Sequence, residues 1–423
     1  MYVSRFCLDA GLLGTDKHLI VEDGSFSWSE TLPGSTWRLT GQPKDLDDWC
    51  LDTAAHLARV KVDPEPPARF INAMSTFSGS LGRPIPWQKV MPAPEHRAFT
   101  KRLVEAGVAA MDPGTLNYLE GTWKAGNSVL RALQPAAVNG QRWRELVAAG
   151  EGNVPAVKSF CPMDGSYAAP VRYSRLATLT GRLTVVSGPQ ILTLKKEHRD
   201  VIASRYGDKG CVVSVDFSSL EARILLYETG VTCNDDDLYA PLARKVGTRR
   251  NVVKGILISM MYGGSGHAAH GINGSGLASV IRQVDKAFGI KDLTKRLKAE
   301  FIATGRITNR YGRKIVIDEP LDRIFINYFA QSTGVDVALL GFSHMLERLR
   351  VEAPSAVPLY VLHDGLYLDV QLGELDAVKR VKGLRVEGYG EREFPVKIEV
   401  IAGHTAGRAA VEAADGSSEN EDE

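Results

Sequence analysis

The stretch Arg250-Asn-Val-Val-Lys254-Gly-Ile-Leu-Ile258-Ser-Met-Met-Tyr262-Gly263 places a distinct side chain at every fourth residue. This spacing predicts that Arg250, Lys254, Ile258 and Tyr262 share one face of a helix. The two cations stand near the expected helix start, where the backbone dipole also favours anions. One end of the face therefore suits a polyphosphate and the other end suits a flat ring. A nucleotide has that shape, although the same pattern alone is more often an ordinary amphipathic surface helix.

Two further segments, one on each side of this stretch, carry a carboxylate at the end of a strand-like run. The segment Gly210-Cys-Val-Val-Ser-Val-Asp216 is apolar and β-prone, so it predicts a strand ending near Asp216. The segment Leu359-Tyr-Val-Leu-His363-Asp364-Gly365-Leu-Tyr-Leu-Asp-Val370 predicts a β-hairpin with Asp364 at its tip, because Asp-Gly is favoured where a tight hairpin needs positive φ. Each segment alone is explained by ordinary strand and turn chemistry. Together with the helix between them, they indicate one functional site.

In this order the three segments resemble motifs A, B and C of the family A (DNA polymerase I-like) DNA polymerases. The segment Asp216-Phe-Ser-Ser-Leu-Glu221-Ala-Arg223 resembles the family's Asp-Tyr-Ser-Gln-Ile-Glu-Leu-Arg, and His363-Asp364 resembles its His-Asp-Glu. The stretch 250–263 resembles the O-helix of the fingers. Two more segments resemble family motifs, namely Thr180-Gly181-Arg182-Leu183 and Arg323-Ile-Phe-Ile-Asn327-Tyr-Phe-Ala-Gln331-Ser-Thr-Gly-Val-Asp336. The matches extend over residues 175–370.

The resemblance implies an α+β right-hand polymerase fold with an antiparallel-sheet palm, helical fingers and a helical thumb. We expect five parts: a reduced N-terminal region with the thumb (1–165), the first part of the palm (166–230), the fingers (231–300), the second part of the palm (301–400) and an acidic, disordered tail (401–423).

Proofreading members of the family carry a 3′–5′ exonuclease domain with an Asp-x-Glu pair on a strand. Before the palm, the only Asp-x-Glu is Asp63-Pro64-Glu65, which lies among prolines that strands tolerate badly. We therefore expect a polymerase module without proofreading, and a phage is one expected source.

The chemistry of nucleotidyl transfer explains the carboxylates. The reaction needs divalent cations that activate a hydroxyl and stabilise the leaving pyrophosphate. Asp216 and Asp364 are the candidate ligands, with the backbone carbonyl of Phe217, and such oxygen donors suit two Mg²⁺ ions, with Mn²⁺ as a substitute. The resemblance assigns Arg250 and Lys254 to the incoming triphosphate, where their charge assists catalysis.

The resemblance also implies a pocket for the sugar of the incoming nucleotide. Glu221 and Tyr262 would close it and leave no room for a ribose 2′-hydroxyl, which favours dNTPs. A structural alternative for Glu221 is an ion pair with a nearby basic residue at the helix start. Ile258 stands where the family usually has Phe or Tyr, which bears on packing against the sugar. Gly365 replaces the motif C glutamate and leaves the two aspartates as the metal ligands.

Primer-template DNA is the expected macromolecular partner. The resemblance places six residues at the DNA: Arg182, Gly263, Arg323, Asn327, Gln331 and His363, the last beside the primer terminus. Donors along the minor groove can check base-pair shape without reading sequence. The net charge of the chain is only +1, but residues 241–314 contain 15 Lys or Arg against three acids, which suits a surface that faces phosphates.

Other features limit the class of protein. The five cysteines show no paired spacing, so neither a zinc site nor a disulfide framework is indicated. No apolar run has transmembrane length and no export signal is recognisable, so we expect no membrane partner and a cytoplasmic location, in a bacterial cell or a phage-infected host. A replication or processivity partner is compatible with the expected cytoplasmic location.

The sequence therefore predicts a template-directed DNA polymerase that extends a DNA primer with dNTPs. One alternative is a single-subunit RNA polymerase, which Glu221 opposes. The other is a catalytically inactive relative that only binds primer-template junctions, which the retained Asp216, Lys254 and Asp364 oppose.

Overall fold

The computed structural model describes residues 5–82, 85–150, 154–163, 165–233, 237–264 and 275–403. The chain divides into two compact units: Met1–Lys124 with Gly312–Val316, and Ala125–Tyr311 with Ile317–Glu423. The first unit ends well before residue 165, because the helix that begins at Lys124 makes its contacts in the second unit. There Asn127 accepts a hydrogen bond from Arg175. The expected boundaries of thumb, palm and fingers stay predictions.

The first unit is built on a four-stranded sheet in the order β3-β2-β1-β4, in which β1 is antiparallel to β2 and parallel to β4. Its strands are β1 (Arg5–Leu8), β2 (His18–Glu22), β3 (Ser25–Ser29), β4 (Trp37–Leu39) and the separate β11 (Lys314–Val316). Its helices are α1 (Ala10–Leu13), α2 (Leu51–Ala58), α3 (Ala68–Leu81), α4 (Trp87–Val90), α5 (Ala93–Ala110) and α6 (Pro113–Tyr118), followed by a π-helical turn (Leu119–Trp123). The α5 backbone packs against the sheet at Gly107, where a Cβ would lie 2.3 Å from the Phe6 ring.

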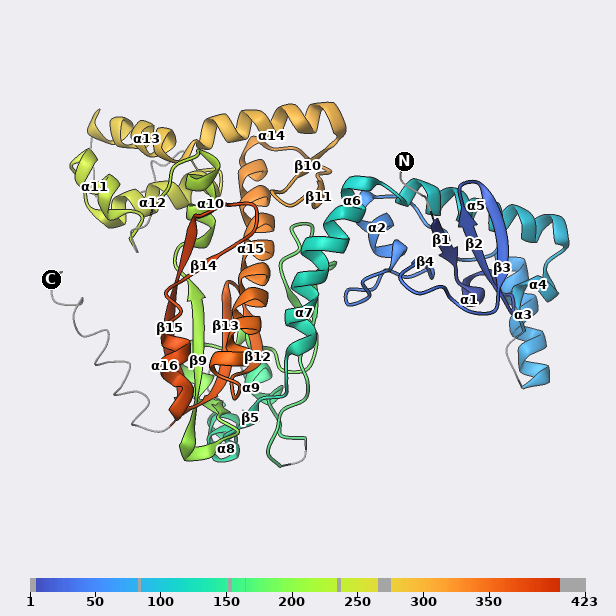
Figure 1. The fold of residues 1–423 in the computed structure, drawn as a ribbon, viewed down its shortest axis with the longest axis horizontal. Helices are drawn as coiled ribbons and strands as arrows, with labels where there is room; N and C mark the ends of the chain where they lie inside the picture. Colours follow the sequence, from blue (N-terminus) through green and yellow to red (C-terminus); the bar gives the residue numbers. More distant parts are fainter. Residues whose placement is uncertain are drawn as a thin grey trace. The chain divides into compact units, whose positions relative to one another are not determined.

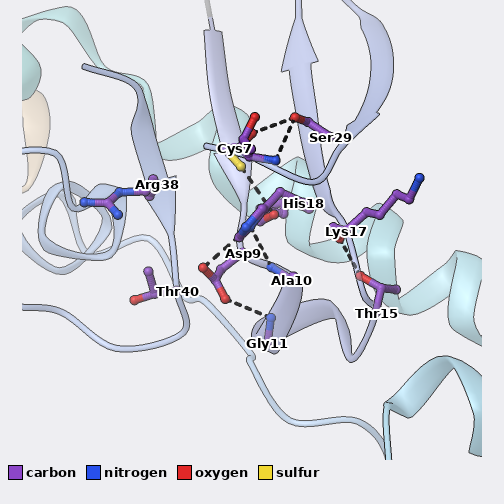
Figure 2. Close-up of polar contacts among 12 residues, drawn as sticks. Cys7, Asp9, Ala10, Gly11, Thr15, Lys17, His18, Ser29, Arg38 and Thr40 are labelled. Atoms are coloured by element: carbon purple, nitrogen blue, oxygen red, sulfur yellow. Dashed lines mark hydrogen bonds and ion pairs between the residues drawn. The ribbon is translucent and has the colours of Figure 1, made fainter. Parts of the chain in front are cut away.

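A polar cluster lies where β1 of this unit leads into α1 (Figure 2). Asp9 accepts a hydrogen bond from the backbone N–H of Gly11 at 2.8 Å and so caps α1. The Nδ1 atom of His18 accepts the N–H of Ala10 at 3.0 Å and lies 3.7 Å from the Asp9 carboxylate. Nδ1 of His18 is thus engaged as an acceptor by Ala10 rather than as a donor to Asp9. The cluster therefore stabilises the strand-to-helix turn.

The second unit contains the five-stranded sheet β12-β13-β9-β15-β14, whose neighbouring strands are all antiparallel. Its strands are β5 (Ala137–Val138), β6 (Arg172–Ser174), β7 (Thr184–Ser187), β8 (Ile202–Ala203), β9 (Gly210–Phe217), β10 (Arg306–Thr308), β12 (Val357–Leu362), β13 (Gly365–Gln371), β14 (Gly383–Arg385) and β15 (Glu393–Gly403). Its helices are α7 (Lys124–Ala132), α8 (Gly140–Ala149), α9 (Val154–Lys158), α10 (Leu220–Glu228), α11 (Ala240–Val246), α12 (Arg250–Met261), α13 (Ser275–Phe288), α14 (Ile290–Thr304), α15 (Asp322–Glu352) and α16 (Leu375–Lys379). The predicted strand, hairpin and helix are thus confirmed as β9, β12–β13 and α12.

Strand β9 is central in the sheet and has two different faces, because side chains alternate along a strand. Val215 and Phe217 point to the apolar face. The long helix α15 runs along this face (Figure 1), and the rings of Phe217 and Phe342 lie 5.3 Å apart. Ser214 and Asp216 point to the opposite face. The alternation therefore buries the strand on α15 while it presents a carboxylate on the other side.

An ion pair in the core of the second unit fixes α15. Arg175 and Asp336 meet at 2.8 Å with side chains that are only 1% exposed. Asn309 donates a further hydrogen bond to Asp336 at 2.7 Å. Removing one partner of such a buried pair typically costs about 3–5 kcal/mol, because the other charge is left uncompensated. Asp336, the last residue of the predicted Arg323–Asp336 motif, therefore has a structural role.

Two further observations concern the predicted tail and the membrane. Ile401 and Gly403 belong to β15, so the tail expected from residue 401 begins no earlier than residue 404, and residues 404–423 lie outside the described residues. The sheet extends farther than predicted because Gly403 still pairs with Cys211 of β9. Among the described helices, none is both long and apolar enough to cross a membrane.

Candidate active site

The two predicted metal ligands lie on neighbouring strands of the five-stranded sheet. In the register of β9 and β13, Asp216 is directly opposite Gly365, the residue after Asp364. The backbone N–H of Phe217 donates to the carbonyl of Asp364 at 3.2 Å. Two acids that are far apart in the sequence are therefore brought together at one edge of the sheet by strand pairing.

The hairpin turn differs from the prediction in one respect. The Asp364-Gly365 dipeptide predicts a turn with positive φ, but the residue with positive φ is His363, at 55°, and Gly365 is already the first residue of β13. Glycine at 365 has a different reason: a Cβ there would lie 1.8 Å from Oδ1 of Asp216. Because Asp216 and residue 365 face each other across the strand pair, only glycine leaves room for the carboxylate in this position.

The electrostatics of the two carboxylates follow from their burial. Desolvation raises the pKa of Asp364 to about 6, and the negative charge of Asp216 adds to this effect. Burial also raises the pKa of Asp216, although Ser214 opposes the shift by donating a hydrogen bond from its hydroxyl to Oδ2. A cation placed between or beside the two carboxylates would therefore stabilise their charged forms.

A cavity of about 580 Å³ lies in the second unit next to these acids. Seven of the predicted site residues line it: Arg182, Glu221, Ile258, Tyr262, Gln331, His363 and Asp364. They come from α10, α12, α15, the β12–β13 turn and the segment before β7. The sequence predicted only the order of these residues along the chain. The fold brings them together around one cavity.

Glu221 stands in the first turn of α10 and faces this cavity. Burial raises its pKa, the negative charge of Asp364 adds to the shift, and Arg182 opposes it. Nη2 of Arg182 lies 3.8 Å from Oε1 of Glu221. The structural alternative considered for Glu221, an ion pair with a nearby base, is thus present, but both partners of the pair line the cavity.

The four-residue stripe of α12 forms the exposed face of that helix. Val253 and Leu257 are buried on the opposite face, whereas Lys254 is exposed, Ile258 is 41% exposed and Tyr262 is 50% exposed. Ile258 and Tyr262 line the cavity. Of the two cations of the stripe, Lys254 lies one turn and Arg250 two turns from Ile258 towards the helix start.

The remaining predicted residues occupy several positions. The ring of Phe217 is buried in the core, so only its backbone is available as a ligand. Asn327 has a buried Oδ1 atom for which no hydrogen-bond partner occurs in the described part of the chain. Gly263 follows α12 with φ of 82°. Arg323 is the second residue of α15, but its side chain lies outside the described residues.

Several residues near the site were not predicted. Ser214 hydrogen-bonds Asp216, and its place two residues earlier on the same strand face was a usable signal. Arg199 and Lys196 lie close enough to Asp216 to lower its pKa, though less strongly than burial raises it. Asp237 pairs with Arg250, and Tyr239 lines the cavity. Unlike Ser214, the other four residues have no fixed spacing from the motifs. Only the tertiary fold brings them to the site.

The donor set fits a divalent oxygen-loving cation. Among the described residues, no group of three His, Cys, Asp or Glu side chains could hold a metal by itself. Mg²⁺ does not need such a cage, because it commonly keeps water and substrate phosphate oxygens and takes one or two carboxylates from the protein. Asp216, Asp364 and the backbone near Phe217 provide that smaller set.

Comparisons with known proteins define the fold. No protein-family model matches the chain, and no curated protein sequence matches it. Among solved structures, the chain is similar to the POL domain of Pol1 from M. smegmatis in complex with DNA primer-template and dNTP. The TM-score is 0.55 at 16% sequence identity, over 85% of this chain and 82% of that chain. The chain thus has the α+β right-hand polymerase fold, with an antiparallel-sheet palm, helical fingers and a helical thumb.

Proposed function

We propose that the protein is a template-directed DNA polymerase that extends a DNA primer with dNTPs in a Mg²⁺-dependent nucleotidyl transfer. One observation carries the proposal: Glu221, Tyr262 and Asp364, from three separate elements, line one cavity, and Asp216 lies on the strand next to Asp364. The similarity of the fold to a polymerase domain solved with primer-template and dNTP supports it.

Asp216 and Asp364 are the residues that would hold two Mg²⁺ ions, or Mn²⁺ in their place. When bound, the ions activate the primer hydroxyl and stabilise the leaving pyrophosphate. The acids themselves contribute negative charge in a fixed arrangement, because Ser214 holds Asp216 and the tight turn holds Asp364. The raised pKa of Asp364 supports this role, since a cation stabilises most strongly a half-buried carboxylate whose charged form is already destabilised.

Residues on the α12 face and on α10 would bind the incoming nucleotide. Arg250 and Lys254 suit the triphosphate, and Ile258 and Tyr262 suit the sugar and base. Glu221 suits the position opposite the 2′ carbon, where a ribose hydroxyl would meet a half-buried side chain. A volume of about 580 Å³ is within the usual range for small-molecule sites.

The remaining residues would contact the primer-template. Arg182 and Gln331 reach the cavity, and His363 stands at the hairpin tip beside Asp364. Asn327 supports the proposal through its buried Oδ1, because buried polar atoms normally have a partner. Arg323 and Gly263 are included on the resemblance alone.

We also infer that the protein lacks a proofreading exonuclease and acts in the cytoplasm of a bacterium or a phage-infected cell, with a possible replication partner. Asp63 and Glu65 lie in the irregular segment between α2 and α3, which supports the first inference. A DNA polymerase acts where the DNA is, which supports the second.

A primer-extension assay tests the proposal against its alternatives. We expect a labelled primer on a DNA template to lengthen with dNTPs and Mg²⁺, to lengthen poorly with rNTPs, and to stay unchanged with excess EDTA. RNA synthesis without a primer would identify an RNA polymerase. Tight primer-template binding without extension, in Mg²⁺ and in Mn²⁺, would identify an inactive relative. Shortening of a mismatched 3′ end without dNTPs would reveal an exonuclease.

A further inference from the structure

The Arg250 side chain, at the start of α12, is already bound to an anion of the protein. Its Nε donates a hydrogen bond to Oδ2 of Asp237, with which it forms an ion pair. The guanidinium carbon also lies 5.4 Å from the centre of the Tyr239 ring, a cation–π contact. Tyr239 is one of the residues that line the nucleotide-sized cavity. The contact between Arg250 and Asp237 is therefore next to the proposed substrate site.

The position of Asp237 is fixed by the backbone. Its Oδ1 accepts the N–H of Tyr239 at 2.8 Å and the N–H of Ala240 at 3.2 Å, at the start of α11. Burial alone would raise the pKa of Asp237, but hydrogen bonds from Arg250 and from these two backbone groups lower it below the ordinary value. Asp237 is thus an anion at neutral pH and is held in place independently of Arg250.

Lys254, the second cation of the stripe, offers a contrast. It is exposed, and it makes no ion pair within the ranges that the structure describes. Both cations assigned to the triphosphate are exposed, but only Arg250 is already paired with an internal carboxylate.

Carboxylate and phosphate oxygens bind a guanidinium in the same way, through short charge-assisted hydrogen bonds. A phosphate oxygen that reaches Nε of Arg250 therefore needs the place that Oδ2 of Asp237 fills. A triphosphate that approaches Arg250 also meets the like charge of Asp237, which is unfavourable at short range.

We propose that Asp237 is an internal competitor for the substrate phosphate at Arg250, and that it sets the affinity for the incoming nucleotide. Arg250 is transferred from Asp237 to the triphosphate when the nucleotide binds. This inference rests on the proposed function. Asp237 is a positioning residue and takes no part in the reaction itself.

The decisive variant is Asp237→Asn. The side-chain oxygen of asparagine can accept the same backbone N–H groups of Tyr239 and Ala240, so these contacts remain while the charge is removed. Binding is measured by isothermal titration on the protein bound to a dideoxy-terminated primer-template, so that no catalysis occurs. We expect the Kd for the matching dNTP to fall about three- to tenfold. Asp237→Ser, whose hydroxyl can also accept a backbone N–H, should change Kd in the same direction.

Asp285→Asn is the matched control. Asp285 also accepts a backbone N–H, from Lys291 at 3.0 Å, and pairs with a cation, Nζ of Lys291 at 3.4 Å. It has no contact with Arg250, so its replacement should leave the Kd for dNTP unchanged. Inorganic triphosphate serves as a second probe. Asp237→Asn should improve its binding as well, whereas binding of the unphosphorylated deoxynucleoside should not respond.

The outcomes separate this inference from the proposed function. Unchanged or weaker dNTP binding by Asp237→Asn, while Arg250→Gln weakens binding, would overturn the competitor role and leave the function intact. The same gain from Asp237→Asn in an Arg250→Gln background would also overturn it, because the effect must act through Arg250. If the wild-type protein binds no dNTP at all, both the proposed function and the inference fail.

Discussion

The palm edge, which carries Asp216 and Asp364, and the predicted fingers helix α12, which lines the cavity next to these acids, are built in opposite ways. On the palm edge, Asp216 lies on the central strand β9, is fixed by Ser214 and fits against Gly365. On α12, Ile258 and Tyr262 are 41% and 50% exposed. The two acids are thus positioned and partly desolvated without any ligand. In contrast, Ile258 and Tyr262 remain exposed on the helix face. Under the proposed function, the metal site is thus preorganised, and nucleotide binding completes the other wall.

The largest expected effect tests the palm side. Asp216→Asn or Asp364→Asn should reduce extension at least about a hundredfold, because each removes metal-binding charge at the reacting phosphate. Primer-template affinity should stay nearly unchanged. Single-turnover extension and a gel-shift titration measure the two quantities, and normal extension by either variant would remove the metal assignment.

Lys254→Ala is the corresponding change on the fingers side. It should raise KM for dNTP more than it lowers kcat, because the exposed cation binds the triphosphate before and during the reaction. A loss of kcat as large as that of Asp364→Asn, at unchanged KM, would contradict the expectation that the α12 face mainly binds the nucleotide while the two acids serve the reaction.

The next effect concerns the sugar pocket where both sides meet. Glu221→Ala should raise the ratio of kcat/KM for rNTP to that for dNTP by about ten- to a hundredfold, since it removes one steric and desolvation clash. The measurement is steady-state extension by single nucleotides. If the ratio does not change, Glu221 acts only as the ion-pair partner of Arg182, and the preference for DNA synthesis loses its main support. Arg182→Gln separates the two roles, because it removes the pair and keeps the glutamate.

A smaller effect is expected from Gly365→Ala, which tests how tightly the palm edge is packed. The new Cβ would overlap Oδ1 of Asp216, so the carboxylate must move and extension should fall on the order of tenfold. Gly373→Ala is the control, since a Cβ there meets nothing within 4 Å. Equal activity of the two variants would show that Asp216 tolerates another position.

The smallest effect is on stability in metal-free buffer. With the pKa of Asp364 raised to about 6 in the folded state, the folded protein keeps this proton when the unfolded chain has lost it. The free energy of unfolding should therefore fall as pH rises from about 4 to about 6, by at most about 3 kcal/mol and less with solvent screening. Asp364→Asn should thus melt a few degrees higher than wild type at pH 8 and equally at pH 4. Equal melting temperatures of wild type and Asp364→Asn at pH 8 would show that the ionised Asp364 carboxylate does not destabilise the folded protein.

The sequence predicted those parts of the site that follow from local periodicity. Strand β9, helix α12 and the β12–β13 hairpin were found because alternation, four-residue spacing and Asp-Gly are local signals. The reason for Gly365 could not be found in this way, because it depends on the strand register that places Asp216 opposite. Asp237 was missed for a similar reason, since nothing in its own neighbourhood indicates a contact with Arg250. The roles of the site residues stay predictions until the variants are measured.

The central position of β9 also decides which changes of chain length the protein can accept during evolution. The strand pairs with β13 on one side and β15 on the other, from Cys211 to Asp216. Deleting one residue there would move the side chains that follow to the opposite face of the sheet. An apolar residue would then take the place of Asp216, and the carboxylate would turn towards α15. No single substitution elsewhere restores that arrangement. Relatives of this protein should therefore carry their insertions and deletions outside β9 and β13, which keep their lengths.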